Sequence, residues 1–233
     1  MTTPRPQASP ASPHQAGPAL MALAGTEAAA ETAPGVATAP GPGPVLLAVT
    51  GSVGGACAAI KAGAGAIELD GFGAGEPQAI ARLRRRHPGV LVCGQSAAAD
   101  VVHRPALALA TGARLICDGA AQAAAAGLPA GRLVVRVLPH GIASAAGHGW
   151  LPLVDADQAA ALAEAAGLAD AAEPGSHDGQ PGLAAVVAVA ALSGWLGAAV
   201  VRTRHPLQVS RALAMAGAIA GLRPPARTVR GLA

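Results

Sequence analysis

Short apolar runs alternate along the chain with alanine-rich stretches of helical length, and this alternation constrains the fold more than any other feature. The runs are rich in Val, Leu and Ile and lack the polar alternation of a half-exposed sheet. Continuous apolar strands that alternate with helices indicate a parallel sheet covered on both faces. The predicted strands span residues 45–50, 66–70, 90–93, 114–118, 133–138, 151–155 and 198–202.

This pattern favours one α/β architecture. Strands separated by helices in nearly every interval predict a TIM-like (β/α) barrel rather than a doubly wound sheet. A full barrel has about eight strands, and the sequence shows one fewer, so the barrel is expected to be degenerate, with one strand reduced. The predicted helices cover residues 55–62, 77–86, 97–110, despite Pro105, and 206–221.

The first 44 residues differ from the rest in composition. They hold nine of the 20 prolines, and Ala, Gly, Ser and Thr fill most of the remainder. Such a segment cannot bury enough apolar surface to fold, so residues 1–44 are predicted to form a disordered tail ahead of one barrel domain over residues 45–233. Residues 19–25 are too short and lack the basic flank of a signal peptide. Residues 183–201 are apolar enough to span a bilayer, but Ala and Gly dominate them and a buried helix and strand are favoured.

Charge and cysteine usage argue against several classes of protein. The formal net charge is only +3, and the one dense basic run, residues 82–86, has no interleaved aromatic residues. Neither nucleic acid nor a membrane is therefore expected as a partner. Cys57, Cys93 and Cys117 stand singly, without CxxC spacing. They predict free thiols in a reducing cytoplasm rather than disulfides or a zinc knuckle.

Polar or glycine residues directly follow each predicted strand. In a barrel, the loops after the carboxyl ends of the strands build the ligand site. Gln95, Asp118 and Asp155 are therefore predicted to line one mouth. Each of these positions also has a purely structural interpretation, because polar and glycine residues are ordinary components of turns.

The last predicted strand ends in Val200-Val201-Arg202-Thr203-Arg204-His205. Strand alternation places Arg202 and Arg204 on one face and Thr203 on the other. Two guanidinium groups on one face, with His205 beside them, form a candidate site for a phosphate or pyrophosphate group. The alternative is a solvated cationic loop.

Several of these segments resemble dihydropteroate synthase, the pterin-binding transferase family of folate synthesis. Residues 194–221 resemble the family's last strand and helix, and Arg202 matches its anion-binding arginine. Residues 112–118 follow the family's Gly-Ala-x-Ile-Ile-Asn-Asp pattern, and residues 65–71 follow its second strand. The resemblance implies a barrel that joins a pterin pyrophosphate to p-aminobenzoate, with Mg²⁺ as a cofactor. It also implies that carboxylates such as Asp118 and Asp155 bind the pterin ring.

The chain departs from the family pattern at several positions that the family uses for binding and catalysis. The Ser-Arg-Lys of the seventh strand is absent, and the only lysine, Lys61, lies in the first predicted helix. These losses predict weak binding and slow or absent turnover. Other residues stand at the family's positions: Ala48 for the metal-associated asparagine, Gly94-Gln95 for an Asp-Thr pair, Cys117 for an asparagine, and Arg204 for a histidine, with His205 one residue later.

Two other functions stay open. A different phosphate-binding barrel enzyme would need a Lys or Glu at a strand end, and Glu68 is the one candidate. A non-catalytic partner subunit of an active synthase would need anchors for an interface, which Trp150 and Trp195 could supply. Homodimer formation is also left open.

A zinc site is a further possible interpretation of the sequence. His140 and His148 flank a glycine-containing segment, and Asp155 follows nearby. Zinc sites need three or four well-placed ligands, and these loop histidines lack a clear third ligand. No metal site is therefore predicted from these residues.

Overall fold

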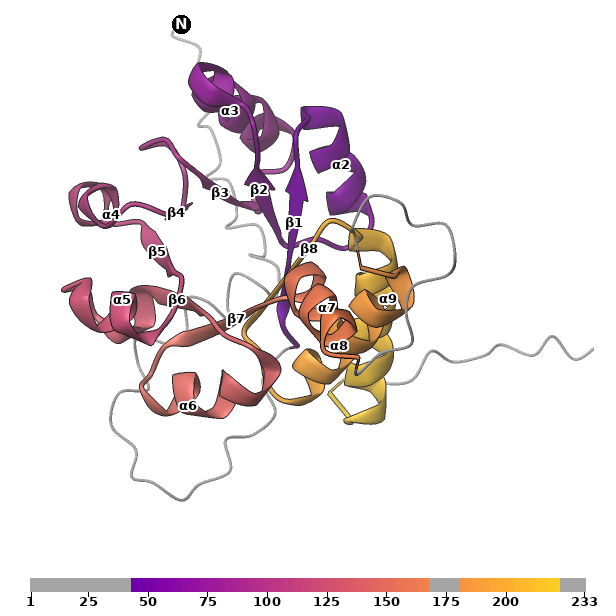
Figure 1. The fold of residues 1–233 in the computed structure, drawn as a ribbon. Helices are drawn as coiled ribbons and strands as arrows, with labels where there is room; N and C mark the ends of the chain where they lie inside the picture. Colours follow the sequence, from indigo (N-terminus) through magenta and orange to yellow (C-terminus); the bar gives the residue numbers. More distant parts are fainter. Residues whose placement is uncertain (1–42, 168–180, 223–233) are drawn as a thin grey trace, which may run out of the picture.

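The computed structural model describes residues 43–167 and 181–222. These residues form a closed barrel of eight parallel strands arranged in chain order, with the helices on its outside (Figure 1). The predicted TIM-like (β/α) barrel is confirmed. The predicted disordered tail, residues 1–44, lies outside the described residues except for its last two.

The strands are short and mostly buried, as expected for a parallel sheet covered by helices. The barrel closes between the first and last strands, where Val45 lies opposite Val200 and Leu47 lies opposite Arg202. The strands are β1 (Val45–Thr50), β2 (Ala66–Leu69), β3 (Leu91–Gly94), β4 (Val101–Val102), β5 (Arg114–Cys117), β6 (Leu133–Arg136), β7 (Leu151–Asp155) and β8 (Val200–Thr203).

Strand β4 corrects the helix predicted over residues 97–110. It is only two residues long, and it pairs with both β3 and β5, so the barrel has eight strands with one of them reduced. Asp100 fixes its start, because the Asp100 amide donates to the Val92 carbonyl (2.8 Å) and its Oδ2 accepts from the Val92 amide (2.9 Å). The helix begins only at Pro105, whose fixed φ suits a first helical position.

Side-chain caps at strand ends start two of the helices. Ser52 Oγ accepts from the Gly55 amide at 2.9 Å, and Asp155 Oδ1 accepts from the Gln158 amide at 3.1 Å. Such caps satisfy backbone donors that a helix leaves free. The helices are α2 (Val53–Lys61), α3 (Glu76–Arg86), α4 (Pro105–Thr111), α5 (Ala120–Ala125), α6 (Ile142–Gly147), α7 (Ala156–Ala165), α8 (Leu183–Trp195) and α9 (Pro206–Ile219).

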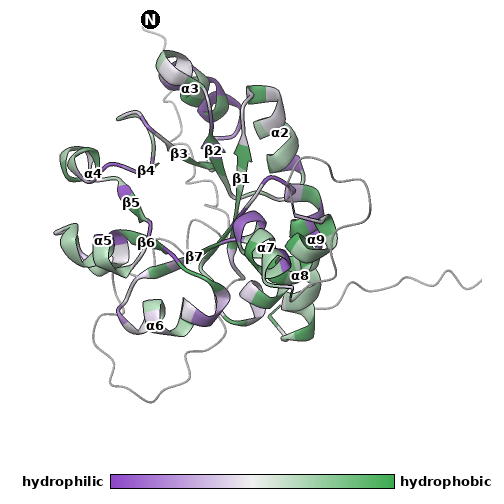
Figure 2. Cartoon of the chain, viewed as in Figure 1, coloured by the Kyte–Doolittle hydropathy of each residue, from purple (hydrophilic) through white to green (hydrophobic). Residues whose placement is uncertain are grey.

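The apolar run 183–201 divides into helix α8 and the start of strand β8. Figure 2 shows hydrophobic residues concentrated in the strands and in helices α8 and α9. Helix α8 packs against α7 and α9. Within the described ranges, no helix combines the length and apolarity that crossing a membrane requires.

Two apolar clusters form the core. The larger cluster lies between the strands and the helices and includes Ile67, Leu83, Leu115, Val186 and Val209. The smaller cluster fills the barrel itself with modest side chains, because alternation turns every second strand residue inward. Its members are Val45, Leu47, Ala66, Cys93, Val101, Ile116, Val134, Leu151, Leu153 and Val200.

Candidate functional site

The inward-facing side chains change from apolar to ionisable toward the carboxyl ends of the strands. Along each strand, every second residue faces the barrel interior. Three apolar interior residues are therefore followed two positions later by a charged one: Ala66 by Glu68, Leu153 by Asp155, and Val200 by Arg202.

Arg202 joins the two carboxylates of this layer. Its Nε donates to Glu68 Oε2 at 2.7 Å, and its Nη2 donates to Glu68 Oε1 at 2.9 Å. Its Nη1 donates to Asp155 Oδ2 at 2.5 Å. All three side chains are largely buried, with exposed fractions of 17%, 12% and 7% for Arg202, Glu68 and Asp155. The guanidinium is thus held rigidly between two acids.

The electrostatics keep this cluster charged. Burial acts to raise the pKa of Glu68, but the hydrogen bonds and charge of Arg202 outweigh burial, so this pKa lies below its ordinary value. Burial acts to lower the pKa of Arg202, and the hydrogen bonds and charges of Glu68 and Asp155 reverse that effect and raise it. Hydrogen bonds to the charged form are the dominant stabilising factor.

Two further side chains, Cys93 and His103, complete a group with Glu68. Cys93 Sγ lies 3.4 Å from His103 Nε2, and that nitrogen lies 3.9 Å from Glu68 Oε1. Burial raises the pKa of the Cys93 thiol well above its usual range, and the charge of Glu68 adds to this effect. Sequence reasoning missed this group, because His103 fell within the helix predicted over residues 97–110.

A cavity of about 190 Å³ opens beside this group, at the ends of β2 and β3. Glu68, Glu76 and His103 lie in its wall, together with Phe72, the only phenylalanine of the chain. The cavity therefore combines acids, an imidazole and one aromatic ring. A flat ring with N–H donors suits such a lining better than an anion does.

Gln95, a predicted site residue, lines the same cavity, and Glu76 holds its backbone in place. Glu76 Oε1 accepts from the amides of Gln95 (2.7 Å) and Ser96 (2.8 Å), although Glu76 is only 2% exposed. Gly94 makes room for this carboxylate, because a Cβ at position 94 would lie 2.8 Å from Glu76 Cδ. The loop after β3 is thus shaped by an acid from α3.

Asp118 is exposed, unlike the buried cluster of Glu68, Arg202 and Asp155. Its side chain is 72% exposed, and its Oδ1 lies 3.1 Å from Nη1 of Arg136 at the end of β6. Gln122 Oε1 accepts from the Asp118 amide at 2.6 Å. Of the two aspartates predicted to line the mouth, Asp118 is therefore exposed and paired with Arg136, whereas Asp155 is buried and paired with Arg202.

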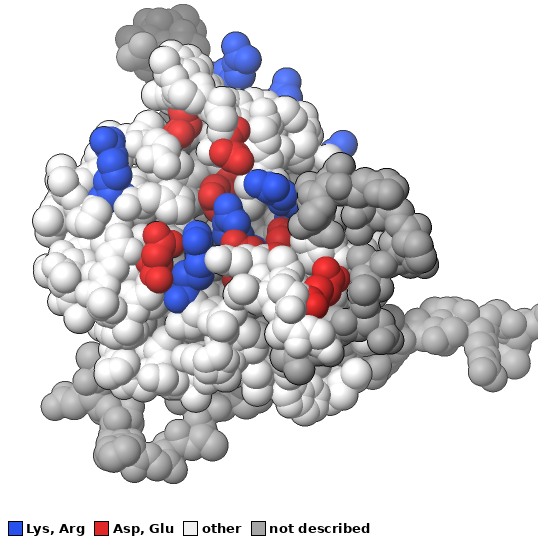
Figure 3. All heavy atoms as spheres, in the orientation of Figure 1, with Lys and Arg blue, Asp and Glu red and all other residues white. Residues whose placement is uncertain are grey.

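Arg204 and His205 lie at the rim. Arg204 is 57% exposed, and its Nη2 lies 3.9 Å from Asp70 Oδ2. Its amide donates to Asp157 Oδ2 at 2.7 Å, and His205 Nε2 lies 3.9 Å from Asp157 Oδ1. Figure 3 shows acidic and basic side chains side by side at the centre of this face. Each predicted anion-binding cation therefore has an acid nearby.

The two histidines of the loop-based zinc candidate, His140 and His148, flank helix α6. His148 packs its ring against Trp150, with the centroids 4.5 Å apart. In the described part of the chain, the one group of three or more potential metal ligands is Glu68, Cys93 and His103. His140 and His148 belong to no such group there.

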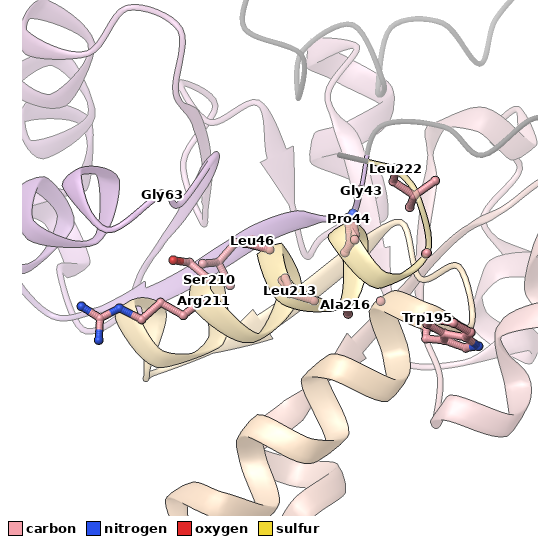
Figure 4. A pocket seen from close by; sticks show the side chains of 14 residues that line it. Gly43, Pro44, Leu46, Gly63, Trp195, Ser210, Arg211, Leu213, Ala216 and Leu222 are labelled. Carbon is pink, nitrogen blue, oxygen red and sulfur yellow. The ribbon is translucent and has the colours of Figure 1, made fainter. Parts of the chain in front are cut away.

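A second cavity, of about 290 Å³, lies between the start of β1 and helices α8 and α9 (Figure 4). Pro44, Leu46, Trp195 and Leu213 line it, and Arg211 is the one ionisable side chain among its described lining residues. This cavity offers no set of groups for acid–base or metal chemistry. The barrel mouth is therefore the candidate functional site.

Solved structures with a similar fold include dihydropteroate synthases. The chain matches the Mycobacterium tuberculosis protein Rv1207 at 19% identity and a TM-score of 0.58, covering 79% of this chain and 94% of that one. It matches Yersinia pestis dihydropteroate synthase at 14% identity and a TM-score of 0.57, covering 76% and 93%. The chain has the fold of dihydropteroate synthases. The resemblance predicted from the sequence is confirmed at the level of the fold.

A third match is the Xanthomonas albilineans dihydropteroate synthase in complex with indole-2-carboxylic acid and 6-chloroguanine. Its identity is 12% and its TM-score is 0.59, over 77% of this chain and 94% of that one. No protein-family model matches the sequence, and no curated protein matches it either. At these identities the likeness concerns the fold.

Proposed function

We propose that this protein is a dihydropteroate-synthase-like pterin-binding protein whose transferase activity is lost or strongly reduced. The observation that carries the proposal is the buried cluster of Glu68, Arg202 and Asp155 beside a cavity lined by Phe72. The fold supports the same assignment, because solved dihydropteroate synthases share it.

The two carboxylates retain acceptor capacity for a ligand. An ionised carboxylate offers about four lone-pair sites. Glu68 uses two of them on Arg202, and Asp155 uses one on Arg202 and one on the Gln158 amide. A pterin presents ring N–H and amino donors along one edge. Glu68 lines the cavity together with Phe72, so its free lone pairs can accept from these donors while Phe72 supplies an aromatic face for the ring, and Asp155 holds Arg202 behind Glu68.

The same geometry argues against efficient release of pyrophosphate. A departing pyrophosphate needs preorganised cations or a metal ion. Arg202 already faces two acids, and Lys61 lies on helix α2 as the only lysine of the chain. Ala48 is buried and has no oxygen ligand in its side chain, so the residue present there does not fit the Mg²⁺ implied by the family.

A paired assay tests the proposal. The full chain is incubated with 7,8-dihydropterin pyrophosphate, p-aminobenzoate and Mg²⁺, and ligand binding is measured in parallel by calorimetry. We expect pterin binding with little or no product, because losing even one preorganised charged contact commonly costs about a hundredfold in rate. Robust turnover would contradict the loss of activity, and absence of pterin binding would contradict the assignment.

We also propose that the chain forms a homodimer. Exposed fractions between 46% and 68% are found for Leu192 and Trp195 on α8, Leu196 directly after it, and Met215 and Ile219 on α9, and apolar surface of this kind supports a homodimer. Light scattering should then give twice the mass of one chain, and Trp195→Ser should reduce it.

We propose that the protein is located in the cytoplasm, because Cys57, Cys93 and Cys117 are free thiols.

A further inference from the structure

Glu68, Cys93 and His103 bring three kinds of metal ligand to one point inside the barrel. Their ligand atoms all lie within 4.8 Å of one another. Cys93 Sγ lies 3.4 Å from His103 Nε2, and Glu68 Oε1 lies 3.9 Å from the same nitrogen. They come from three neighbouring stretches of the barrel wall.

The strand register explains this convergence. Glu68 of β2 lies opposite Cys93 of β3, and Cys93 lies opposite Val101 of β4. His103 follows Val101 by two positions, so alternation directs it toward the same interior. Two of the three side chains are thus fixed by strands of the sheet, and His103 directly follows a third strand, which gives the site more precision than residues on a long loop would have.

We propose that Glu68, Cys93 and His103 bind a zinc ion. Zinc takes thiolate, imidazole and carboxylate ligands at about 2.0–2.3 Å, so tetrahedral ligands lie roughly 3.3–3.6 Å apart. The distance from Cys93 to His103 matches this spacing, and Glu68, whose ligand atom lies within 4.8 Å of the other two, needs to move toward them by up to about an ångström. The mixed sulfur, nitrogen and oxygen set favours zinc over Mg²⁺ or Ca²⁺.

The surroundings support the ion electrostatically. Arg202 holds Glu68 through both carboxylate oxygens, so it orients this ligand as outer partners do in other metal sites. Asp155 in turn balances the charge of Arg202. When zinc binds, Cys93 gives up its thiol proton to solvent, and the thiolate and Glu68 neutralise the charge of the ion.

The fourth coordination position faces a ligand space. Glu68 and His103 both line the cavity of about 190 Å³. Three protein ligands with one open position are typical of catalytic rather than purely structural zinc sites. The open position would hold a water molecule or a donor atom of a bound small molecule. This inference does not depend on the pterin proposal, because the protein's own side chains supply all three ligands.

Metal titration of the full chain, without a histidine tag, tests the site. The chelator-treated protein is titrated with ZnCl₂ by calorimetry and with CoCl₂ by absorption spectroscopy. We expect one tightly bound ion per chain, and a cobalt spectrum with a thiolate-to-metal charge-transfer band and tetrahedral visible bands. Calorimetry in buffers of different ionisation enthalpy should also show proton release.

Ligand variants and a matched cysteine control decide the result. Cys93→Ser and His103→Gln should each weaken zinc binding by at least a hundredfold, about the most that loss of an outer partner costs. Cys93→Ser should also abolish the charge-transfer band, whereas Cys117→Ser, a change at another buried thiol, should leave binding intact. If Cys93→Ser fails to fold, His103→Gln still tests the site. His103 is 25% exposed, so its replacement should disturb the fold less than a change at the buried Cys93 does. Absence of stoichiometric zinc binding, or binding unchanged in His103→Gln, would overturn the proposal.

Discussion

Arg202 and Glu68 lie 134 residues apart in the sequence, yet they form a two-pronged ion pair inside the barrel, with N···O distances of 2.7 and 2.9 Å. Glu68 belongs to β2 and Arg202 to β8, and both strands pair with β1. The pair therefore bridges the seam where the barrel closes. Its removal should affect both stability and the site.

Arg202→Ala should lower the free energy of unfolding by about 3 kcal/mol, because it leaves two buried acids without their cation. Urea denaturation checks this, with Arg204→Ala as the control. Arg204 is 57% exposed, and its loss should change stability by less than about 0.5 kcal/mol. Equal effects of the two substitutions would show that the buried pair does not stabilise the fold.

The lowered pKa of Glu68 predicts a specific acid dependence. A carboxylate whose pKa is lower in the folded chain stabilises the fold above its unfolded pKa, and this contribution is lost as the pH falls through the folded pKa. The Glu68 contribution should thus be complete above about pH 4.5 and decline below it. Urea midpoints across this range should fall more steeply for the wild type than for Glu68→Gln. Parallel curves would contradict the pairing with Arg202.

Gly94→Ala should destabilise the loop after β3. The new Cβ would collide with the carboxylate of Glu76, which cannot move without releasing the amides of Gln95 and Ser96. We expect a loss of about 1–3 kcal/mol, as for other overpacked sites. Gly89→Ala is the control, since nothing lies within 4 Å of a Cβ there. A neutral Gly94→Ala would mean that Glu76 relaxes freely.

Most of the fold could be predicted from the sequence, because seven of the eight strands are continuous apolar runs. Strand β4 could not. Its two residues, Val101 and Val102, lie in an alanine-rich segment with helical composition, and they form a strand because β3 and β5 pair with them and Asp100 fixes their start. Tertiary contacts override local propensity in so short a strand.

The site could be predicted only in part. The position of Asp155 at a strand end and the alternation around Arg202 led to the prediction that both residues lie at the barrel mouth, and the structure joins them directly. Strand alternation carries no information on which side chains lie opposite a given residue, so the acids beside Arg202 and Arg204 could not be predicted from the sequence. The Cys93–His103 contact was missed for a related reason, since His103 joins the interior only through the unpredicted strand β4.

The central claim is that the barrel mouth binds a pterin-type ring and not an isolated anion. Isothermal titration of 7,8-dihydropterin and of inorganic pyrophosphate into the same full-length protein tests this most directly. We expect saturable pterin binding that Phe72→Leu weakens by about 0.5–1.5 kcal/mol, the range for a lost aromatic contact, and no measurable pyrophosphate binding. Pyrophosphate binding that Arg202→Ala abolishes, with no binding of the pterin, would contradict it.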